Sequence, residues 1–403
     1  MRIRRFVGCS LSAVVMGAGM LTMGGTAVSS SAGAATKGPL IVGDICSCTG
    51  PEASSLSQTS ATLDAWAAAV NAKGGVDGHK VQVIVKDDGY SPANALAAAQ
   101  SLVEVDHVAV IDDNSDVDQA FAPYVEAQGV PVVGAANSVF SQDSVFFVNG
   151  ATYNMFNAIG DYNLEQAHIK KVTDFYCAEV AVCSANIPAS KADLAKHGIE
   201  YSYLTAIGYA APNYDAQCIA AKQSGATAIG VGDATQIVIK VMEECAAQNY
   251  HPKLFSGDGT VATSWLPIPA MEGMIAFQPN YPYFLKTSVT KPMYAALAKY
   301  APGITTSQNF GEIVLETWAA GVEIEIAGAT GRLGADPTAA QMLSGLNHMP
   351  KGTTLRGLSG PLTFTSGHNG HTEGCFWTMG IHNKKFVALR NNKAVCLSHS
   401  LAS

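Results

Sequence analysis

The strongest constraint on the fold of this chain is a regular alternation of short apolar runs with segments of helical periodicity, which starts at Leu40. The first helical segment places Leu63, Trp66, Ala67 and Val70 at the i, i+3, i+4, i+7 spacing of one helix face. The predicted strands are 40–42, 81–85, 108–111 and 130–133, and the predicted helices are 63–70, 92–102 and 121–127. Strands separated by helices of this length form right-handed βαβ units, so this part of the chain predicts a parallel sheet.

The same alternation restarts after about residue 155, which predicts a second α/β sheet. Its predicted strands are 172–176, 200–204, 227–231 and 254–255, and its predicted helices are 190–197, 216–224 and 237–248. A Pro-bearing stretch at 278–282 then reads as a crossover, and helices at 292–300, 309–327 and 339–346 are expected to cover the first sheet. Phe364, Phe376 and Val387 are expected to lie in short strands near the end of the chain, in a hairpin tied by Cys375 and Cys396.

The first 34 residues have the pattern of an export signal. Arg2, Arg4 and Arg5 precede an apolar run over 6–28, and Ala32-Gly33-Ala34 supplies a cleavage pattern. A transmembrane anchor is the alternative, since the run is long enough to span a bilayer, and a lipid anchor at Cys9 is a second. Glycine, serine and threonine dilute the run, and Cys9 has almost no apolar run before it, so we expect cleavage. The protein is then exported and soluble, in the periplasm or on the exterior of the cell envelope.

Export changes how the nine cysteines are interpreted, because Cys9 leaves with the signal. An even number of cysteines in an oxidising compartment favours disulfides over catalytic thiols or a metal site. The eight form four pairs that are near in sequence: Cys46 with Cys48, Cys177 with Cys183, Cys218 with Cys245, and Cys375 with Cys396. The first pair would close a short ring, and a soft-metal site at Cys46 and Cys48 stays open as the alternative.

Charge and motifs exclude several classes of function. The chain has 24 Lys and Arg against 32 Asp and Glu, and lacks the basic clusters that neutralise nucleic-acid phosphates. It contains no G-x-S-x-G, H-E-x-x-H or P-loop pattern, and no G-x-G-x-x-G placed after a predicted strand. The segment 368–373 could offer metal ligands, but its Asn-Gly reads better as a hairpin turn. We therefore expect no enzyme, no cofactor and no metal.

Polar residues follow several of the predicted strands, at the sheet edge where parallel α/β folds bind ligands. In the first sheet they lie in the loops 43–51, 112–116 and 134–138, whose small and hydroxylic side chains leave donors free for an anion. In the second sheet Asp233 and Asp258 lie beside glycines and could meet an ammonium group. Ordinary helix capping is the alternative for any one of these residues.

The sequence resembles the type I periplasmic solute-binding proteins of ABC importers, in the branched-chain amino-acid-binding group. The resemblance rests on Gly50-Pro51, on the stretch 70–81 with its Gly-Gly-Val-x-Gly turn, on Lys86-Asp87-Asp88, and on 127–133. It implies two Rossmann-like lobes with parallel sheets joined by a hinge of crossover segments. The implied first lobe is 35–152 plus 283–355, and the second is 153–282 plus 356–403.

The resemblance also implies where a ligand binds between the lobes. In that family, loops after the third and fourth strands bind the α-carboxylate, and an acid of the second lobe binds the ammonium. The matching positions are Ser47 in the first loop, then Asn114, Ser115, Ala136, Asn137 and Ser138, with Asp258 as the acid and Tyr153 and Asp233 as weaker carry-overs. Asp112-Asp113, Cys46-Ser47-Cys48 and Asn137 depart from the family pattern and suggest a solute more polar or cationic than leucine.

The implied function is binding rather than turnover. We expect a monomer whose lobes close on a small polar solute, an amino acid or a related amide or amine, in the manner of a Venus flytrap. The closed form would dock on an ABC permease in the membrane. A sensor that delivers its ligand to a receptor is the alternative, because its pocket would look the same.

Overall fold

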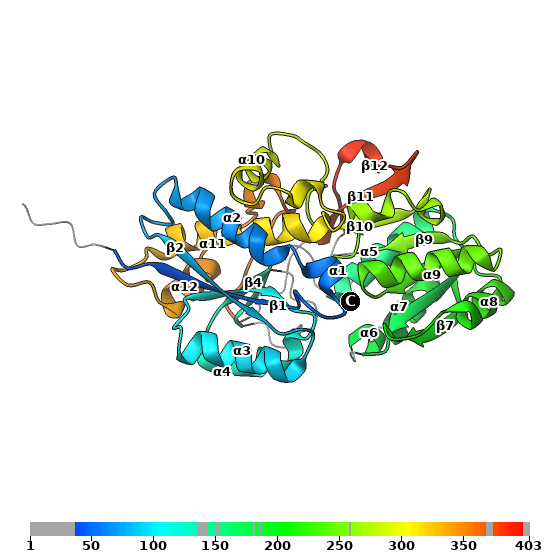
Figure 1. Cartoon of the computed structure of the whole chain (residues 1–403), viewed down its shortest axis with the longest axis horizontal. Coiled ribbons are helices and arrows are strands. Elements are labelled where there is room, and N and C mark those ends of the chain that lie inside the picture. Colours follow the sequence, from blue (N-terminus) through cyan, green and yellow to red (C-terminus); the bar gives the residue numbers. More distant parts are fainter. Residues whose placement is uncertain are drawn as a thin grey trace, which may run out of the picture. The chain divides into compact units, whose positions relative to one another are not determined.

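Two β-sheets, each covered by helices on both faces, organise the chain in the computed structural model (Figure 1). The structure describes residues 37–134, 144–149, 153–179, 182–185, 187–257, 259–367 and 374–397. The predicted signal peptide lies outside these ranges. Residues 37–403 cluster as one compact unit.

The first sheet is parallel throughout and has the strand order β2-β1-β3-β4-β5. Its strands are β1 (Leu40–Cys46), β2 (Val81–Asp87), β3 (Val110–Asn114), β4 (Val132–Gly134) and β5 (Phe146–Val148). The four predicted strands are confirmed. The fifth, β5, was not predicted from the sequence, although its apolar residues 146–148 are buried.

Helices cover both faces of this sheet because its strands alternate their apolar residues between the two sides. Leu40, Val42 and Val110 share one core cluster with Trp66 of α2 (Thr59–Asn71), whereas Ile45 and Ile111 pack in another cluster. That second cluster includes residues of α3 (Pro92–Glu104) and α4 (Ala122–Gln128), on the opposite face from α2 in Figure 1. The predicted parallel α/β layer is confirmed.

Helices far along the sequence complete this layer. They are α10 (Lys291–Tyr300), α11 (Glu312–Gly331) and α12 (Ala339–Asn347). α11 contacts α2, β3 and β4, and α12 packs on α11. The approach of α11 to α2 is close, since a Cβ on Gly321 would come within 2.5 Å of the Trp66 ring. The predicted return of the chain to the first sheet is confirmed, while the predicted lobe boundaries stay a prediction.

The second sheet has the strand order β12-β11-β10-β9-β8-β6-β7, with β13 paired to β11. Its strands are β6 (Lys171–Cys177), β7 (Glu200–Ile207), β8 (Ala228–Gly232), β9 (Lys253–Ser256), β10 (Ile275–Gln278), β11 (Gly374–His382), β12 (Lys385–Ala388) and β13 (Val395–Leu397). The strands from β6 to β10 are parallel, and β11 pairs antiparallel with β10, β12 and β13.

One strand prediction near the C-terminus is wrong. Phe376 and Val387 lie in β11 and β12 as expected, but Phe364 lies outside any strand. Pro361 cannot donate a backbone hydrogen bond, and a lone bridge between Thr353 and Leu362 is the pairing found next to it. The Phe364 ring instead packs edge-on against Phe147, with 5.0 Å between the ring centroids.

The second sheet is also covered on both faces. Its helices are α5 (Tyr153–Gln166), α6 (Val182–Ala185), α7 (Ile187–Lys196), α8 (Asp215–Ser224) and α9 (Thr235–Ala247). Val172 and Ala228 pack with Leu164 and Leu194 of α5 and α7. Phe175 and Ile229 instead join the cluster that holds Met242 of α9. The sequence predicted α7, α8 and α9 but not α5 or α6.

No helix in the described ranges is both long enough and apolar enough to cross a bilayer.

A cavity of about 110 Å³, with a wall more apolar than polar, lies between the second sheet and helices α5 and α7. Its wall includes Asp161, Asp174, Ser190 and Tyr201. The Ser190 hydroxyl lies 3.0 Å from Asp161 Oδ1 and 3.1 Å from the Tyr201 hydroxyl. Burial raises the pKa of Asp174 to about 6 and the pKa of Asp161 to about 7. Both carboxyls are therefore held largely protonated in mildly acidic solution.

These raised pKa values predict that acid stabilises the fold. The folded state binds more protons than the unfolded state between pH 4 and pH 7, so the free energy of unfolding falls as the pH rises through that range. For Asp174, a shift from 3.8 to about 6 corresponds to about 3 kcal/mol. Urea unfolding measured from pH 4 to pH 7 should show this loss, and Asp174→Asn should reduce it.

Asp77→Asn is the control, because Asp77 is an exposed acid of the first lobe that pairs with Lys37 and contributes to the pKa of neither Asp161 nor Asp174. It should leave the pH slope of the wild type in place. Equal slopes for Asp174→Asn and the wild type would contradict the assignment of a protonated Asp174.

Candidate functional site

The carboxyl ends of six parallel strands carry the residues that make up the candidate site. Glu52, Tyr90 and Asp116 follow β1, β2 and β3 of the first sheet. Glu179, Tyr209 and Asp233 follow β6, β7 and β8 of the second. Ligands of open α/β sheets bind at this edge, where the loops converge. We call Glu52, Asp116, Glu179 and Asp233 the strand-end acids.

Two tyrosines from different sheets meet at this edge. The Tyr90 and Tyr209 rings make an edge-to-face contact, with centroids 6.4 Å apart and planes at 87°. The Tyr90 amide donates to Asp88 Oδ1 at 2.7 Å, and the Tyr209 amide donates to Glu179 Oε1 at 2.9 Å. Tyr90 has a φ of 66°, a left-handed conformation that costs a bulky residue energy. The turn after β2 thus holds this ring in place at the expense of local strain.

The strand-end acids act on one another and on Tyr90. Burial raises the pKa of Glu52 well above its usual range, and the charges of Asp116 and Asp233 raise it further. Burial also raises the pKa of Asp233 to about 7, and Glu179 and Asp116 contribute to that shift. The pKa of Tyr90 is raised by burial and then by all four acids. Four carboxyl groups from two sheets therefore share one region around the Tyr90 ring.

The negative charge of this region has little compensation within the described residues. Glu52, Glu179 and Asp233 take part in no ion pair there. Asp233 Oδ1 accepts from the Ala234 amide at 2.8 Å, but Asp233 Oδ2 is buried without a hydrogen bond in the same described part. The nearby Lys240 ammonium donates to the Ala211 carbonyl and lies over the Tyr214 ring. A carboxylate oxygen thus stays available to a donor.

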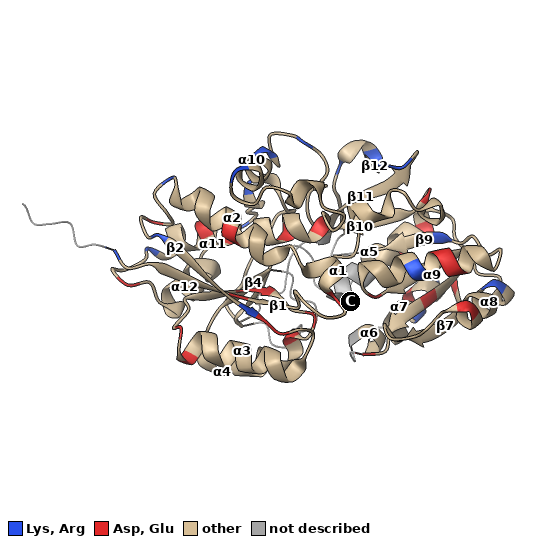
Figure 2. Cartoon of the chain, viewed as in Figure 1, with Lys and Arg blue, Asp and Glu red and all other residues tan. Residues whose placement is uncertain are grey.

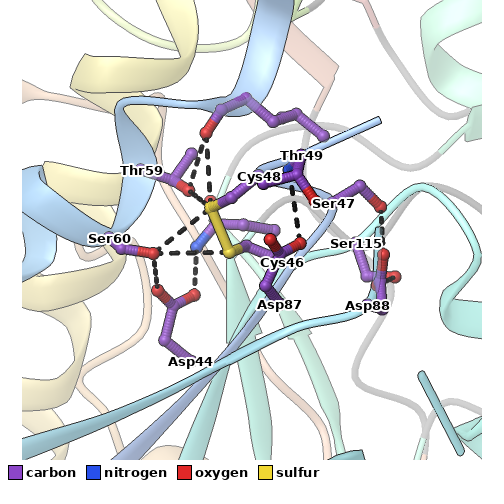
Figure 3. The surroundings of a disulfide bond; sticks show 12 residues. Asp44, Cys46, Ser47, Cys48, Thr49, Thr59, Ser60, Asp87, Asp88 and Ser115 are labelled. Carbon is purple, nitrogen blue, oxygen red and sulfur yellow. Dashed lines mark hydrogen bonds between the residues drawn. A yellow bond between two sulfur atoms is a disulfide. The ribbon is translucent and has the colours of Figure 1, made fainter. Parts of the chain in front are cut away.

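The structure brings three predicted ligand residues together, on the carboxylate of Asp88 and its neighbours. The Ser47 hydroxyl donates to Asp88 Oδ1 at 2.8 Å, and the Ser115 hydroxyl donates to Asp88 Oδ2 at 2.6 Å (Figure 3). The Asn114 amide donates to Asp44 Oδ1 at 3.0 Å and to Asp112 Oδ2 at 2.9 Å. The donors expected to bind a solute carboxylate are therefore engaged with carboxyl groups of the chain itself.

The structure describes only some of the remaining predicted site residues. Asp233 lies with the strand-end acids, as described. Tyr153 is the first residue of α5, and its side chain is outside what the structure describes. Ala136, Asn137, Ser138 and Asp258 lie outside the described residues. Their roles therefore stay predictions.

The sulfur atoms of all four predicted cysteine pairs lie at bonding distance: Cys46 with Cys48, Cys177 with Cys183, Cys218 with Cys245, and Cys375 with Cys396. The first pair closes the loop directly after β1, with Ser47 between the two cysteines. No group of three or more His, Cys, Asp or Glu suited to a metal ion occurs among the described residues.

Sequence reasoning missed Glu52, Tyr90, Glu179 and Tyr209 and named Asp116 only as part of the loop 112–116, so Asp233 is the one of the six that was a predicted ligand residue. It weighted small and hydroxylic residues as anion binders and gave no weight to larger acids and aromatics in the same loops. A usable signal was present, because each of the four lies within a few residues of a strand end. Only the family resemblance predicted that loops of the two sheets face the same region, because periodicity and spacing carry no information about it.

The first backbone amides of helix α9 donate hydrogen bonds to a loop of the other sheet. Its N-cap residue, Ala234, has no side chain that can cap. The Thr235 amide donates to Ser55 Oγ at 3.1 Å, and the Gln236 amide donates to Ser54 Oγ at 3.3 Å. Both serines belong to α1 (Ala53–Leu56), which follows β1. A loop of the first sheet thus caps a helix of the second (Figure 1).

Comparison with known proteins gives one family match. A family model described as periplasmic binding protein matches residues 39–385. No curated protein sequence matches the chain.

Solved structures share the fold at low sequence identity. A branched-chain amino-acid ABC transporter protein from Thermus thermophilus with bound valine has a TM-score of 0.78 at 13% identity, over 91% of this chain and 98% of that one. A fatty acid ABC transporter substrate-binding protein from Thermomonospora curvata has a TM-score of 0.77 at 16% identity, over 90% and 93%. An ABC transporter solute-binding protein from R. palustris in complex with benzoate has a TM-score of 0.72 at 16% identity, over 89% and 98%. The predicted two-lobe α/β fold is confirmed.

The serine contacts with α9 predict a local change in amide exchange. Replacing Ser54 and Ser55 by Ala removes the acceptors of the Thr235 and Gln236 amides, and each lost cap hydrogen bond is worth about 1 kcal/mol. Hydrogen–deuterium exchange at the first turn of α9 should become about five-fold faster. Ser91→Ala is the control, because Ser91 caps α3 within the first lobe. Unchanged exchange in the double variant would show that the serines do not bind α9 in solution.

Proposed function

The chain belongs to the periplasmic binding protein family, and we propose that it binds a small organic cation between its two lobes and presents it to an ABC permease. The observation that carries the proposal is the set of strand-end acids around Tyr90. Carboxylates that are buried near one another repel, and a positive charge placed among them removes that repulsion. An amine-bearing solute meets this requirement.

The hydroxyl groups at the site also favour a solute without a carboxylate. The solutes named for the three solved structures, valine, a fatty acid and benzoate, each carry a carboxylate. In this chain Ser47 and Ser115 both donate to Asp88, so a solute carboxylate would have to compete with that side chain. It would also meet the negative charge of Asp116, next to Ser115. We therefore favour an amine, a polyamine or a quaternary ammonium compound over a free amino acid.

The tyrosines supply a second feature that suits a cation. Tyr209 is 43% exposed, and its ring meets that of Tyr90 from the opposite sheet. Aromatic faces attract ammonium groups, and the attraction grows when water is excluded. Carboxylates and aromatic rings together bind organic cations more selectively than either alone, because inorganic cations gain less from the rings.

The proposal includes a role in import, and this role is supported by the solved structures that share the fold. The three solved structures named above are described as parts of ABC transporters. A sensor that delivers the same solute to a receptor is the alternative, and genes for a permease and an ATPase beside this one would favour the importer.

The first prediction from the proposed function concerns the class of solute that the protein binds. A thermal-shift panel of amines, quaternary ammonium compounds, amino acids, amides and carboxylates of similar size should raise the melting temperature only for compounds with a net positive charge. For the best compound, Glu52→Gln and Asp233→Asn should each weaken binding by about ten-fold or more in isothermal titration.

Glu200→Gln is the matched control, since Glu200 is an exposed acid at the opposite end of β7. It should bind like the wild type. Stabilisation by anionic or neutral compounds, with none by cations, would refute the proposed solute class.

The second prediction concerns pH. A cation binds the ionised form of Asp233, whose pKa in the unbound protein is about 7. Affinity for a quaternary ammonium compound, whose charge does not change with pH, should therefore rise about ten-fold from pH 6 to pH 8 and then level off. Titrations at four pH values test this, and Asp233→Asn should flatten the curve. An affinity that falls with rising pH would contradict the role of Asp233.

A further inference from the structure

The disulfide between Cys46 and Cys48 has surroundings that differ from those of an inert structural bridge. We propose that it is a redox-active site, which undergoes reversible thiol–disulfide exchange with an external dithiol. Cys46 is fully buried as the last residue of β1, whereas Cys48 is partly exposed in the loop that follows. An incoming thiolate can therefore reach the Cys48 sulfur, and Cys46 is the sulfur that leaves.

Both sulfurs lie against the start of a long helix. Cys48 Sγ is 3.3 Å from Thr59 Oγ1 and 3.3 Å from Ser60 Oγ, and Cys46 Sγ is 3.3 Å from Ser60 Oγ (Figure 3). Thr59 and Ser60 are the first two residues of α2, which has 13 residues. The Thr59 hydroxyl donates to the Leu56 carbonyl at 3.0 Å, whereas the Ser60 hydroxyl, which donates to Asp44, can turn its proton to a sulfur once Asp44 is protonated. A helix N-terminus and such a hydroxyl donor stabilise a thiolate and lower its pKa. This position therefore favours the reduced form and eases the departure of the Cys46 sulfur.

A hydrogen-bond chain links the leaving sulfur to a proton source. The Ser60 hydroxyl lies 2.8 Å from Asp44 Oδ2 and 3.3 Å from Cys46 Sγ. Asp44 is fully buried, and burial raises its pKa to about 6. A proton on Asp44 can pass through Ser60 to the Cys46 thiolate, because the hydroxyl accepts from one partner while it donates to the other.

The exchange balances in two steps. The external thiolate attacks Cys48 Sγ, a mixed disulfide forms, and the Cys46 thiolate leaves and takes up a proton. The second thiol of the reductant then attacks its own sulfur in the mixed disulfide and releases Cys48, which is also protonated. Two electrons pass from the dithiol to the protein, and the dithiol becomes a disulfide.

Cys177–Cys183 and Cys375–Cys396 also combine a buried cysteine with a more exposed one. The Cys46–Cys48 pair is distinguished by the contact of its sulfurs with the Thr59 and Ser60 hydroxyls at the start of α2. Cys218 and Cys245 are both fully buried. Cys375 and Cys396 face each other across β11 and β13. The Cys46–Cys48 bridge spans a sequence separation of 2, against 6, 27 and 21 for the others, so it restrains the unfolded chain least. Stability alone is therefore a weak reason for this bridge.

Reduction has a structural consequence at the candidate site. Ser47 lies between the two cysteines, and its hydroxyl contacts both Asp88 Oδ1 and the Asp116 amide, the latter at 3.2 Å. Opening the ring frees the backbone of Ser47, and with it the loop that carries Asp116. The redox site itself does not depend on which solute binds.

The test is a redox titration of the oxidised, full-length exported protein with dithiothreitol in its reduced and oxidised forms. Samples are quenched in acid and alkylated, and the thiol state of each cysteine is read by peptide mass spectrometry. Cys46 and Cys48 should become half reduced at a ratio of reduced to oxidised dithiothreitol at least 100-fold lower than the other three pairs require. Circular dichroism at that ratio should still report the native fold.

The Ser60→Ala variant tests whether the hydroxyl next to the sulfurs, and not only the short ring closed by the disulfide, makes Cys46 and Cys48 easy to reduce. This variant loses the hydroxyl next to both sulfurs, and it should need about a ten-fold higher ratio of reduced dithiothreitol and react more slowly. Ser101→Ala is the control, because Ser101 is a helix serine of the same lobe that donates to a carboxylate, Asp106, away from the cysteines. Simultaneous reduction of all four pairs, failure of Cys46 and Cys48 to oxidise, or an unchanged Ser60→Ala variant would overturn the proposal.

Discussion

The carboxylate of Asp88 is the constraint on which the candidate site depends. It follows β2 and accepts hydrogen bonds from Ser47 after β1, from Ser115 after β3 and from the Tyr90 amide. The loops that follow three adjacent strands thus all contact one fully buried side chain. Because a buried carboxylate without partners is costly, these loops are held in a single arrangement, and Tyr90 is held with them. An internal anion occupies donors that could otherwise bind the carboxylate of a solute.

The same use of buried acids recurs through the first lobe. Asp44, Asp112, Asp113 and Glu323 are each fully buried, and burial raises the pKa of every one of them. Figure 2 shows acidic positions along α11 and next to β1. A raised pKa favours the neutral, protonated form of these carboxyls. Asp44 and Asp112 accept from the Asn114 amide, whereas neither oxygen of Glu323 has a hydrogen-bond partner among the described residues. The interior thereby adds little negative charge of its own. At the candidate site Asp233, with a pKa of about 7, ionises as the pH rises through neutrality.

The sequence predicts what depends on local periodicity and misses what depends on distant contacts. Most strands and helices were predicted, because the spacing of apolar residues over a short stretch of sequence indicates each of them. The burial of Asp44 within β1 was not, since an aspartate in a strand is expected to face water. The hydrogen bond from Ser47 to Asp88 joins residues that are 41 positions apart, and periodicity gives no information about such a contact. Phe364 shows the reverse error, because apolar residues can pack in the core without forming a strand.

Opposing forces between the lobes explain how binding and closure can be coupled. Glu52 and Asp116 come from the first sheet and Asp233 from the second, so bringing them together without a cation costs Coulomb energy. The contacts of Ser54 and Ser55 with α9 act in the other direction, because they join a loop of the first sheet to a helix of the second. Under the proposed function, a cation among the acids removes the repulsion and leaves the serine contacts to favour closure. The cation would then bind the closed state more tightly than the open state, because the acids surround it only in the closed state. A ligand must have such a difference in affinity to shift the open–closed equilibrium.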